Sequence, residues 1–274
     1  EKFSEAAQAL ETVIQSGTYS LVTDYNTIFE AEGENSTESV FEVQYTDLEG
    51  AGFGCLQCSE GNIAVGFSGV RNYEGPDFTS GFSFNVPVQE AYEAFDSDDP
   101  RRDIAILNID AWATATGATF GTGFEHTGYF NRKYIPRTRS DQALADLNLT
   151  NPNNYRSIRY ADVLLMHAEA ILSGGQSTTS TNALASFQEV RNRAGLTTLV
   201  TEITKEDLLN ERRVELAFEN HRLFDLIRMG EAATVLGAFS SANSLSFSST
   251  DLLLPIPQRE IGLSNGLLTQ NPGY

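Results

Sequence analysis

Lysine, histidine and cysteine are all scarce in this chain. Its lysines are Lys2, Lys133 and Lys205, against fifteen arginines, and its acidic residues give a formal net charge of −19. The first sixty residues alone carry twelve acids and a single base. Because a surface this acidic repels nucleic acid and anionic lipid headgroups, we expect no nucleic acid partner. An acid-rich surface with little lysine suits a protein that is bathed in salt or exposed outside the cell.

Long apolar runs are also lacking. No stretch approaches the length of hydrophobic sequence that spans a bilayer, and no signal peptide is present. The chain opens within a helical pattern at residues 1–7, so we expect a fragment or a processed form. Its 274 residues, 41% of them hydrophobic, suffice for one large domain or two small ones. We predict one domain over residues 1–274.

The sequence has no arrangement typical of a catalytic centre. The histidines, His126, His167 and His221, lie far apart, and none belongs to a pair with the spacing of a zinc-binding helix. No Gly-x-Ser-x-Gly nucleophile motif occurs. The glycine-rich segment 117–123 is not followed by the lysine of a phosphate-binding loop. We therefore expect no cofactor, no metal and no enzymatic activity.

The cysteines are Cys55 and Cys58, spaced Cys-Leu-Gln-Cys in a glycine-rich loop. A thioredoxin-like pair would lie between a strand and a helix, and a zinc site would need two further ligands. These requirements favour a local disulfide in an oxidising compartment. Free thiols, and metal or redox chemistry, stay open as alternatives.

Apolar residues recur at intervals of three and four in several segments, which is the spacing of amphipathic helices. The predicted helices cover residues 3–15, 158–172, 182–194, 204–219 and 221–229. We expect Asn182 to cap the third of these, and Thr204 with Asp207 to cap the fourth. Helices joined by short polar loops make antiparallel hairpins, the unit of tetratricopeptide-like repeats. We thus predict a mainly α fold, with hairpins over 155–238 and a remnant repeat helix over 1–16.

The middle of the chain is different. Residues 40–45 form a short extended pattern and residues 88–95 a helical turn. The segments 46–82 and 103–150 are rich in glycine, threonine and polar residues, which predicts loops and irregular strands. Because long loops in one domain are unusual unless they build a binding surface, we predict that residues 46–150 hold the ligand.

Charged residues are dense between residues 211 and 228. Glu211, Glu215 and Glu219 follow one another at one-turn spacing, which could suggest the paired carboxylates of a glycoside hydrolase. Each glutamate, however, has an arginine within reach on the same or the next helix. Because nearby positive charge depresses a carboxyl pKa, the pattern favours a structural ion-pair network over a general acid.

Aromatic residues in polar, turn-forming surroundings are the better candidates for a binding site. Trp112, the only tryptophan, and Tyr73 have such neighbours, and Phe82 and Phe84 flank Ser83. Flat rings cover the C–H face of a sugar while nearby polar groups bond to its hydroxyls. We choose Trp112 and Tyr73 as stacking residues. Their candidate hydrogen-bonding partners are Arg71, Asn72, Asp77 and Asn108.

Several blocks, in a consistent order, resemble the SusD/RagB family of outer-membrane nutrient-binding lipoproteins. The strongest are residues 158–165 (Ile-Arg-Tyr-Ala-Asp-Val-Leu-Leu), 190–195 (Val-Arg-Asn-Arg-Ala-Gly), 211–219 and 222–226, with the proline-punctuated tail over 250–274. Segments 46–82 and 105–127 show no recognisable match. The resemblance implies a mainly helical SusD-like scaffold with a large loop-rich region and a pinned C-terminal tail.

The resemblance also implies a function. Family members bind oligosaccharides, or in some cases peptides, at the outer membrane and deliver them to a TonB-dependent (SusC-like) transporter without catalysis. We therefore expect a cell-surface lipoprotein whose lipid anchor is not in this chain, binding an oligosaccharide or polysaccharide. A peptide-binding receptor of the same transporter type is the alternative, and a glycoside hydrolase is a weaker one.

Overall fold

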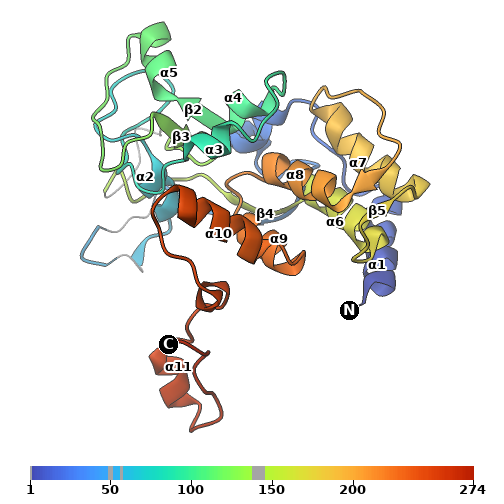
Figure 1. Cartoon of the computed structure of the whole chain (residues 1–274). Helices are drawn as coiled ribbons and strands as arrows, with labels where there is room; N and C mark the ends of the chain where they lie inside the picture. Colours follow the sequence, from blue (N-terminus) through green and yellow to red (C-terminus); the bar gives the residue numbers. More distant parts are fainter. Residues whose placement is uncertain (1, 49–51, 56–57, 138–145) are drawn as a thin grey trace. The chain divides into compact units, whose positions relative to one another are not determined.

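The computed structural model describes residues 2–48, 52–55, 58–137 and 146–274, and the chain divides into two compact units, 1–220 and 221–274. The first unit contains helices, three pairs of short antiparallel strands and long connecting loops (Figure 1). The mainly helical fold predicted from the sequence is confirmed. The assignment of residues 1–274 to one domain stays a prediction.

Three helices form the regular part of the first unit. Helix α6 (Tyr160–Leu172) packs against α7 (Thr181–Arg193) on one side and against α1 (Phe3–Gln15) on the other. The helix pair α6–α7 is the hairpin that the periodicity predicts, while α1 has no fully buried residue. The expected cap Asn182 is wrong, because α7 begins one residue earlier, at Thr181.

Helix α8 (Lys205–Glu215) shows how a local signal fixes a helix start. Thr204 Oγ1 accepts a hydrogen bond from the amide of Asp207, and the Asp207 carboxylate accepts one from the amide of Thr204. This capping box confirms the predicted start. The predicted end at Glu219 is wrong: the helix stops at Glu215, and Phe218 and Asn220 then adopt left-handed backbone conformations.

Short elements connect these helices to the loop-rich part of the first unit. They are 3-10 helices η1 (Tyr25–Phe29) and η2 (Ala31–Gly33), helices α2 (Ile63–Ser68), α3 (Gln89–Tyr92), α4 (Arg101–Ala105) and α5 (Ile109–Thr116), and strands β1 (Ser39–Val43), β2 (Ile106–Asn108), β3 (Tyr129–Asn131), β4 (Tyr155–Arg159), β5 (Ser177–Thr178) and β6 (Ile203–Thr204). The strand pairs are β1–β4, β2–β3 and β5–β6. Strand β1 confirms the extended pattern predicted over 40–45.

Helix α5 corrects the expectation of loops and irregular strands throughout 103–150. The side chain of Asn108 accepts a hydrogen bond from the amide of Ala111 at 3.0 Å, which caps the helix. Gly117, with φ of +76°, ends it in the left-handed region that favours glycine. Trp112 therefore lies on a helix.

The second unit comprises α9 (Arg222–Arg228), α10 (Ala232–Ala242), the 3-10 helix η4 (Ser249–Leu252) and α11 (Gln258–Leu263). Its tail folds on itself: the amide of Ile256 donates to Gln270 Oε1 at 2.8 Å, and Gln270 Nε2 donates back to the Ile256 carbonyl. Helix α11 has no buried residue. Helix α9 confirms the helix predicted over 221–229.

Candidate functional site

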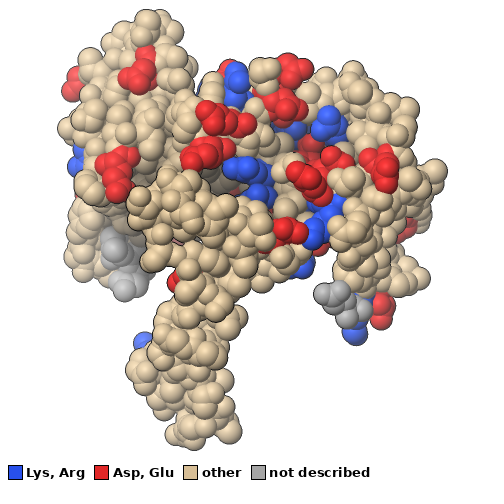
Figure 2. All heavy atoms as spheres, viewed as in Figure 1, with Lys and Arg blue, Asp and Glu red and all other residues tan. Residues whose placement is uncertain are grey.

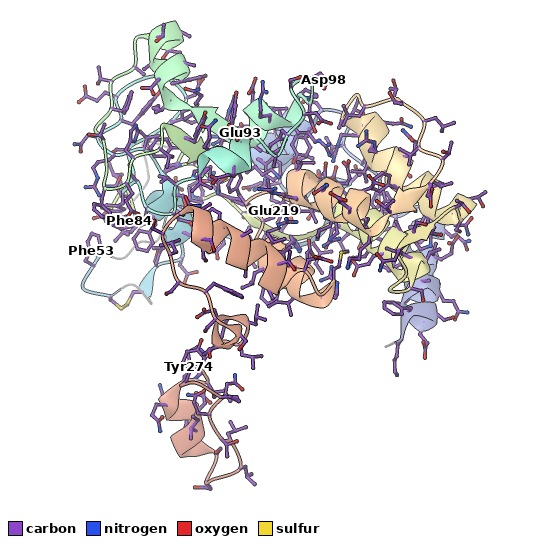
Figure 3. The ribbon with its side chains drawn as sticks, viewed as in Figure 1. Phe53, Phe84, Glu93, Asp98, Glu219 and Tyr274 are labelled. Carbon is purple, nitrogen blue, oxygen red and sulfur yellow. A yellow bond between two sulfur atoms is a disulfide. The ribbon has the colours of Figure 1, made fainter. Side chains whose placement is uncertain are left out.

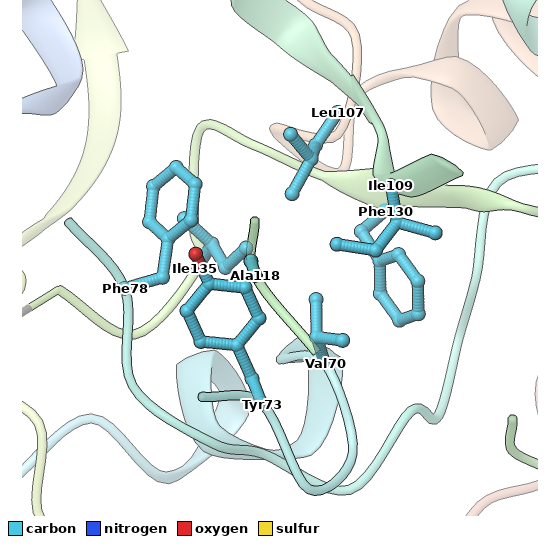
Figure 4. Close-up of a cluster of buried hydrophobic side chains, with 8 residues drawn as sticks. All are labelled: Val70, Tyr73, Phe78, Leu107, Ile109, Ala118, Phe130 and Ile135. Atoms are coloured by element: carbon cyan, nitrogen blue, oxygen red, sulfur yellow. The ribbon is translucent and has the colours of Figure 1, made fainter. Parts of the chain in front are cut away.

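The two stacking residues chosen from the sequence do meet. Trp112 Nε1 donates a hydrogen bond of 2.8 Å to the hydroxyl of Tyr73, which in turn donates to the carbonyl of Pro76. The ring of Tyr73 is 5% exposed and belongs to a buried hydrophobic cluster with Val70 and Phe78 (Figure 4). Trp112 is half-buried against the same cluster. The ligand-binding role of the pair stays a prediction, since the faces of Tyr73 are covered here.

The four predicted hydrogen-bonding partners have different surroundings in the structure. Arg71 donates from Nη2 to the carbonyl of Phe82 at 2.7 Å, and Asn72 is exposed beside Gly121. Asp77 is exposed, and the carboxamide oxygen of Asn108 is occupied by the α5 cap. Of these four residues, Arg71 is the one that bonds to the segment 82–84.

That segment is part of a group of phenylalanine rings, which we call the ring cluster: Phe53, Phe67, Phe82 and Phe84. Phe82 stacks on Phe84 with ring centroids 6.0 Å apart and an interplanar angle of 20°. Phe53 meets Phe82 edge-on at 5.9 Å, and Phe67 contacts both Phe82 and Phe84. Phe53 and Phe84 lie close together in Figure 3 and are 63% and 54% exposed. The cluster is thus a contiguous aromatic surface open to solvent.

Backbone contacts hold the ring cluster in place. The amides of Phe82, Ser83 and Phe84 donate to the carbonyls of Gly66, Gly69 and Phe67, at 2.7–3.0 Å. This pairing is close: a Cβ on Gly81 would lie 2.5 Å from Gly69 Cα and 2.6 Å from the Gly66 carbonyl oxygen. Glycine at position 81 therefore lets the 82–84 segment lie against the end of α2, with its rings outward.

A further exposed ring lies beside this cluster. Phe124 is 87% exposed. Its neighbour Gly123 lies against Ser83, since a Cβ there would be 2.8 Å from Ser83 Cβ. The loop that carries Phe124 therefore borders the segment that carries Phe82 and Phe84.

Cys55 and Cys58 are joined by a disulfide, the alternative that the sequence favours. The bond lies two residues after Phe53, whose flanking glycines, Gly52 and Gly54, have open space around them. The loop thus contributes an exposed ring that contacts Phe82 and lies close in sequence to the disulfide.

Sequence reasoning noted Phe82 and Phe84 but did not choose them, and it missed Phe53, Phe67 and Phe124. A signal was present for Phe53 and Phe124. Both stand next to glycine in segments rich in glycine and polar residues, outside any apolar periodic pattern.

The acids of the charged segment are buried and paired. Glu215 bonds to Arg101, Arg159 and Arg193, and Glu219 to Lys133 and Arg159; Figure 2 shows acidic and basic side chains together over α4, α7 and α8. Burial raises the pKa of the Glu215 carboxyl, but these arginines outweigh it and hold the pKa well below its usual range. The predicted ion-pair network is present, and these acids do not offer the proton donor that a hydrolase needs.

Metal chemistry finds no support in the described ranges. Among those residues, no group of three or more His, Cys, Asp or Glu side chains is arranged to hold a metal ion. Within the same ranges, no helix has the length and apolar character needed to cross a bilayer.

The chain belongs to the SusD family, whose profile matches residues 27–274. It is 28% identical to SusD-like protein P2 of Formosa agariphila, over 99% of this chain and 56% of that protein. The membership confirms the resemblance read from the helical blocks.

Solved structures agree with this membership. A laminarin-binding SusD-like protein matches with a TM-score of 0.86 and 34% identity, over 100% of this chain and 59% of that one. Surface glycan-binding protein A from Bacteroides thetaiotaomicron, in complex with laminarihexaose, matches with a TM-score of 0.84 and 32% identity, over 98% of this chain and 59% of that one. The chain spans little more than half the length of each of these relatives.

Proposed function

We propose that this chain is the ligand-holding part of a surface glycan-binding protein that retains an oligosaccharide without cleaving it. The observation that carries the proposal is the exposed ring cluster of Phe53, Phe67, Phe82 and Phe84. Monomeric proteins rarely leave contiguous apolar rings in water unless the rings contact a partner.

The chemistry of the cluster suits a glycan. Stacked phenylalanine rings present flat, uncharged faces, and the C–H faces of a pyranose ring pack well against such faces. The guanidinium of Arg71 lies beside the cluster, where it donates to the carbonyl of Phe82, and groups of this kind also bond to sugar hydroxyls.

Laminarin is the first glycan to test. Two proteins of known structure with more than 30% identity to this chain are a laminarin-binding protein and one solved in complex with laminarihexaose. A peptide is the other ligand class expected from the sequence. Exposed stacking rings favour the glycan, since peptide sites depend more on grooves and strand-edge hydrogen bonds.

Location and partner form part of the same proposal. We place the whole protein at the outer surface of the outer membrane, working with a TonB-dependent transporter. Family membership and the acidic composition support this placement. Co-purification of the full-length protein with such a transporter from membranes is the test, and recovery of the protein from the cytoplasmic fraction would contradict the placement.

The binding test compares Phe84→Ala and Phe82→Ala with the unaltered protein in an affinity gel containing laminarin, followed by calorimetry with laminarihexaose. We expect each substitution to weaken binding about tenfold, equivalent to about 1.4 kcal/mol, because a stacking face is lost. Phe41→Ala is the matched control, since Phe41 is 56% exposed on β1 but outside the cluster. The unaltered protein should leave laminarihexaose intact.

Three results would contradict the proposal. They are equal retention of all variants, no binding to any glycan in a screen that includes laminarin, and tight binding of a peptide in place of a glycan. Thermal melting of each variant distinguishes lost binding from lost fold.

A further inference from the structure

A second feature of the first unit adjoins the ring cluster and is not explained by it. This is a cavity of about 240 Å³ between α2, the end of β3 and the start of β4, which we call the amide pocket. Liquid water occupies about 30 Å³ per molecule, so the cavity holds about eight waters. Pockets for drug-sized ligands begin near ~300 Å³, so its natural occupant is about the size of one sugar ring.

The lining of the amide pocket carries no ionised side chain. Its eleven residues include four asparagines, one serine and three tyrosines, and the others are Ala64, Val65 and Phe218. Amide and hydroxyl groups supply both donors and acceptors, whereas an ionic ligand would find no opposite charge. Two of the tyrosine rings, Tyr134 and Tyr155, contact each other at 5.7 Å. The pocket therefore suits a neutral ligand with many hydroxyl groups.

Three of the lining side chains are almost completely buried yet keep unused hydrogen-bonding groups. Asn62, Ser68 and Asn131 are 5%, 8% and 6% exposed. Asn62 Nδ2 donates to the Asn153 carbonyl, and Asn131 Oδ1 accepts from the amide of Tyr134. Within the described part of the chain, no hydrogen bond engages Asn62 Oδ1, Ser68 Oγ or Asn131 Nδ2. None of the three atoms belongs to the solvent-excluded unpaired atoms of the described residues, so they face the open pocket and are available to a polar occupant.

The pocket and the ring cluster share the same two segments of chain. Helix α2 supplies Phe67 to the ring cluster and the next residue, Ser68, to the pocket. Likewise Phe84 belongs to the cluster, and the next residue, Asn85, lines the pocket. Asn85 is exposed, so the pocket opens to solvent beside an exposed ring. A glycan lying on the cluster can therefore extend one of its units into the pocket.

We propose that the amide pocket binds one neutral polyhydroxylated ring, as a free monosaccharide or as a terminal or branching unit of the glycan on the ring cluster. This inference rests on the proposed function. The pocket gives the surface selectivity that flat rings lack, because the geometry of fixed amide and hydroxyl groups discriminates between hydroxyl configurations.

Two variants test the pocket. Ser68→Val replaces the buried hydroxyl with apolar bulk, and Asn85→Gly removes an exposed amide at a position whose φ of +54° glycine adopts without strain. Calorimetry with laminarihexaose should show affinity about three- to tenfold lower in each, the loss expected for one or two hydrogen bonds. Asn265→Gly, also at positive φ (+52°) but not a lining residue, is the control and should bind unchanged.

Glucose as a second probe separates the two sources of ligand. If glucose alone binds, and Ser68→Val weakens it while Phe84→Ala does not, then the pocket accepts a free monosaccharide. If only laminarihexaose is affected, then the pocket accepts a unit of the longer chain. Should Ser68→Val melt much lower than the parent, Asn85→Gly carries the test.

The inference is overturned if both variants bind both probes as the unaltered protein does. Crystals soaked with glucose and with laminarihexaose that both show only water in the pocket would also overturn it. In either case the proposed function stands as long as the unaltered protein binds the glycan and Phe84→Ala weakens binding. Failure of the unaltered protein to bind any glycan is instead a failure of the proposed function.

Discussion

The first unit contains two cavities of opposite chemistry. The amide pocket, at about 240 Å³, is lined only by uncharged residues. The other, about 480 Å³, lies between α7, α8 and the segment before α4, and its lining includes five carboxylates and the arginines Arg101 and Arg191. Both arginines are already engaged: Arg101 bonds to Asp99, Glu211 and Glu215, and Arg191 to Glu211.

This difference separates two regions: the charged network, which supports the fold, and the ring cluster with the amide pocket, which we propose to recognise the ligand. The arginines beside the larger cavity pair with Asp99, Glu211 and Glu215, and the two glutamates lie more than 100 residues from Arg101 in the sequence. The rings and amides of the loop-rich part have bonding capacity left over and face solvent. Buried ion pairs are weak evidence for net stability, but breaking one is costly because it strands a charge. We therefore expect the two regions to respond differently to substitution, pH and reductant.

Arg159→Met gives the largest expected effect and tests the support side of the comparison. Arg159 is 1% exposed and pairs with Glu38, Glu215 and Glu219. Its removal leaves buried carboxylates short of positive charge, which should lower the free energy of unfolding by about 3–5 kcal/mol. Urea denaturation at pH 7 measures the change.

The matched control is Arg102→Met. Arg102 pairs with the exposed Asp103 at 3.2 Å and is itself partly exposed, so its loss should cost less than about 1 kcal/mol. Equal effects of the two substitutions would show that the buried network is not what holds the unit together.

As the pH falls, the fold should lose stability before the protein loses affinity for the glycan. We expect this effect to be smaller than that of Arg159→Met. Burial opposes ionisation of Glu215 and Glu219, but Arg193, Arg159 and Lys133 outweigh it and lower both carboxyl pKa values. Between the folded pKa and the unfolded value of about 4.3, the unfolded chain binds more protons, so stability is present above about pH 5 and lost as pH falls.

Thermal and urea unfolding at pH 7, 5, 4 and 3 should show a loss of about 2–4 kcal/mol by pH 3. Laminarihexaose affinity should stay flat from pH 5 to 8, because the ring cluster and the lining of the amide pocket contain no carboxyl group and no histidine. Affinity that falls across pH 5–8 while the fold persists would place an ionised group in the site.

The sequence predicted the charged network better than the proposed ligand-binding region, for a physical reason. Glu211 and Glu215 lie one turn apart on α8, so local periodicity places these two together, while Glu219 comes after the end of the helix. Their partners Arg101 and Lys133 come from segments about 80 to 115 residues away. Local patterns could predict that pairing partners were needed, but only the fold could identify these two.

The ring cluster depends on the same kind of long-range convergence without any periodic signal. Phe53, Phe67 and Phe82 come from a glycine-rich loop, a six-residue helix and an irregular segment. Trp112 was chosen because its neighbours are polar, yet those neighbours form a capped eight-residue helix too short for a clear apolar stripe. Its bond to Tyr73 shows that polar surroundings in sequence do not ensure exposure in space.

Removing the disulfide should give the smallest change in glycan affinity, and it tests how the ring of Phe53 is positioned. Phe53 meets Phe82 edge-on and lies two residues before the Cys55–Cys58 disulfide, and a Cβ added at Gly52 or Gly54 would meet open space. Opening the disulfide should leave Phe53 less ordered before ligand arrives, and ordering it on binding then costs free energy. We expect the Cys55→Ser/Cys58→Ser double variant to bind laminarihexaose about threefold more weakly, or about 0.7 kcal/mol.

Phe53→Ala supplies the control that ties this effect to the ring. Reductant should weaken binding by the unaltered protein to the level of the double variant and should have no further effect on Phe53→Ala. If reductant weakens both proteins equally, the disulfide acts on the site through something other than Phe53. If it weakens neither, the contact with Phe82 alone is enough to position the Phe53 ring. The ring cluster would then keep its arrangement without the disulfide.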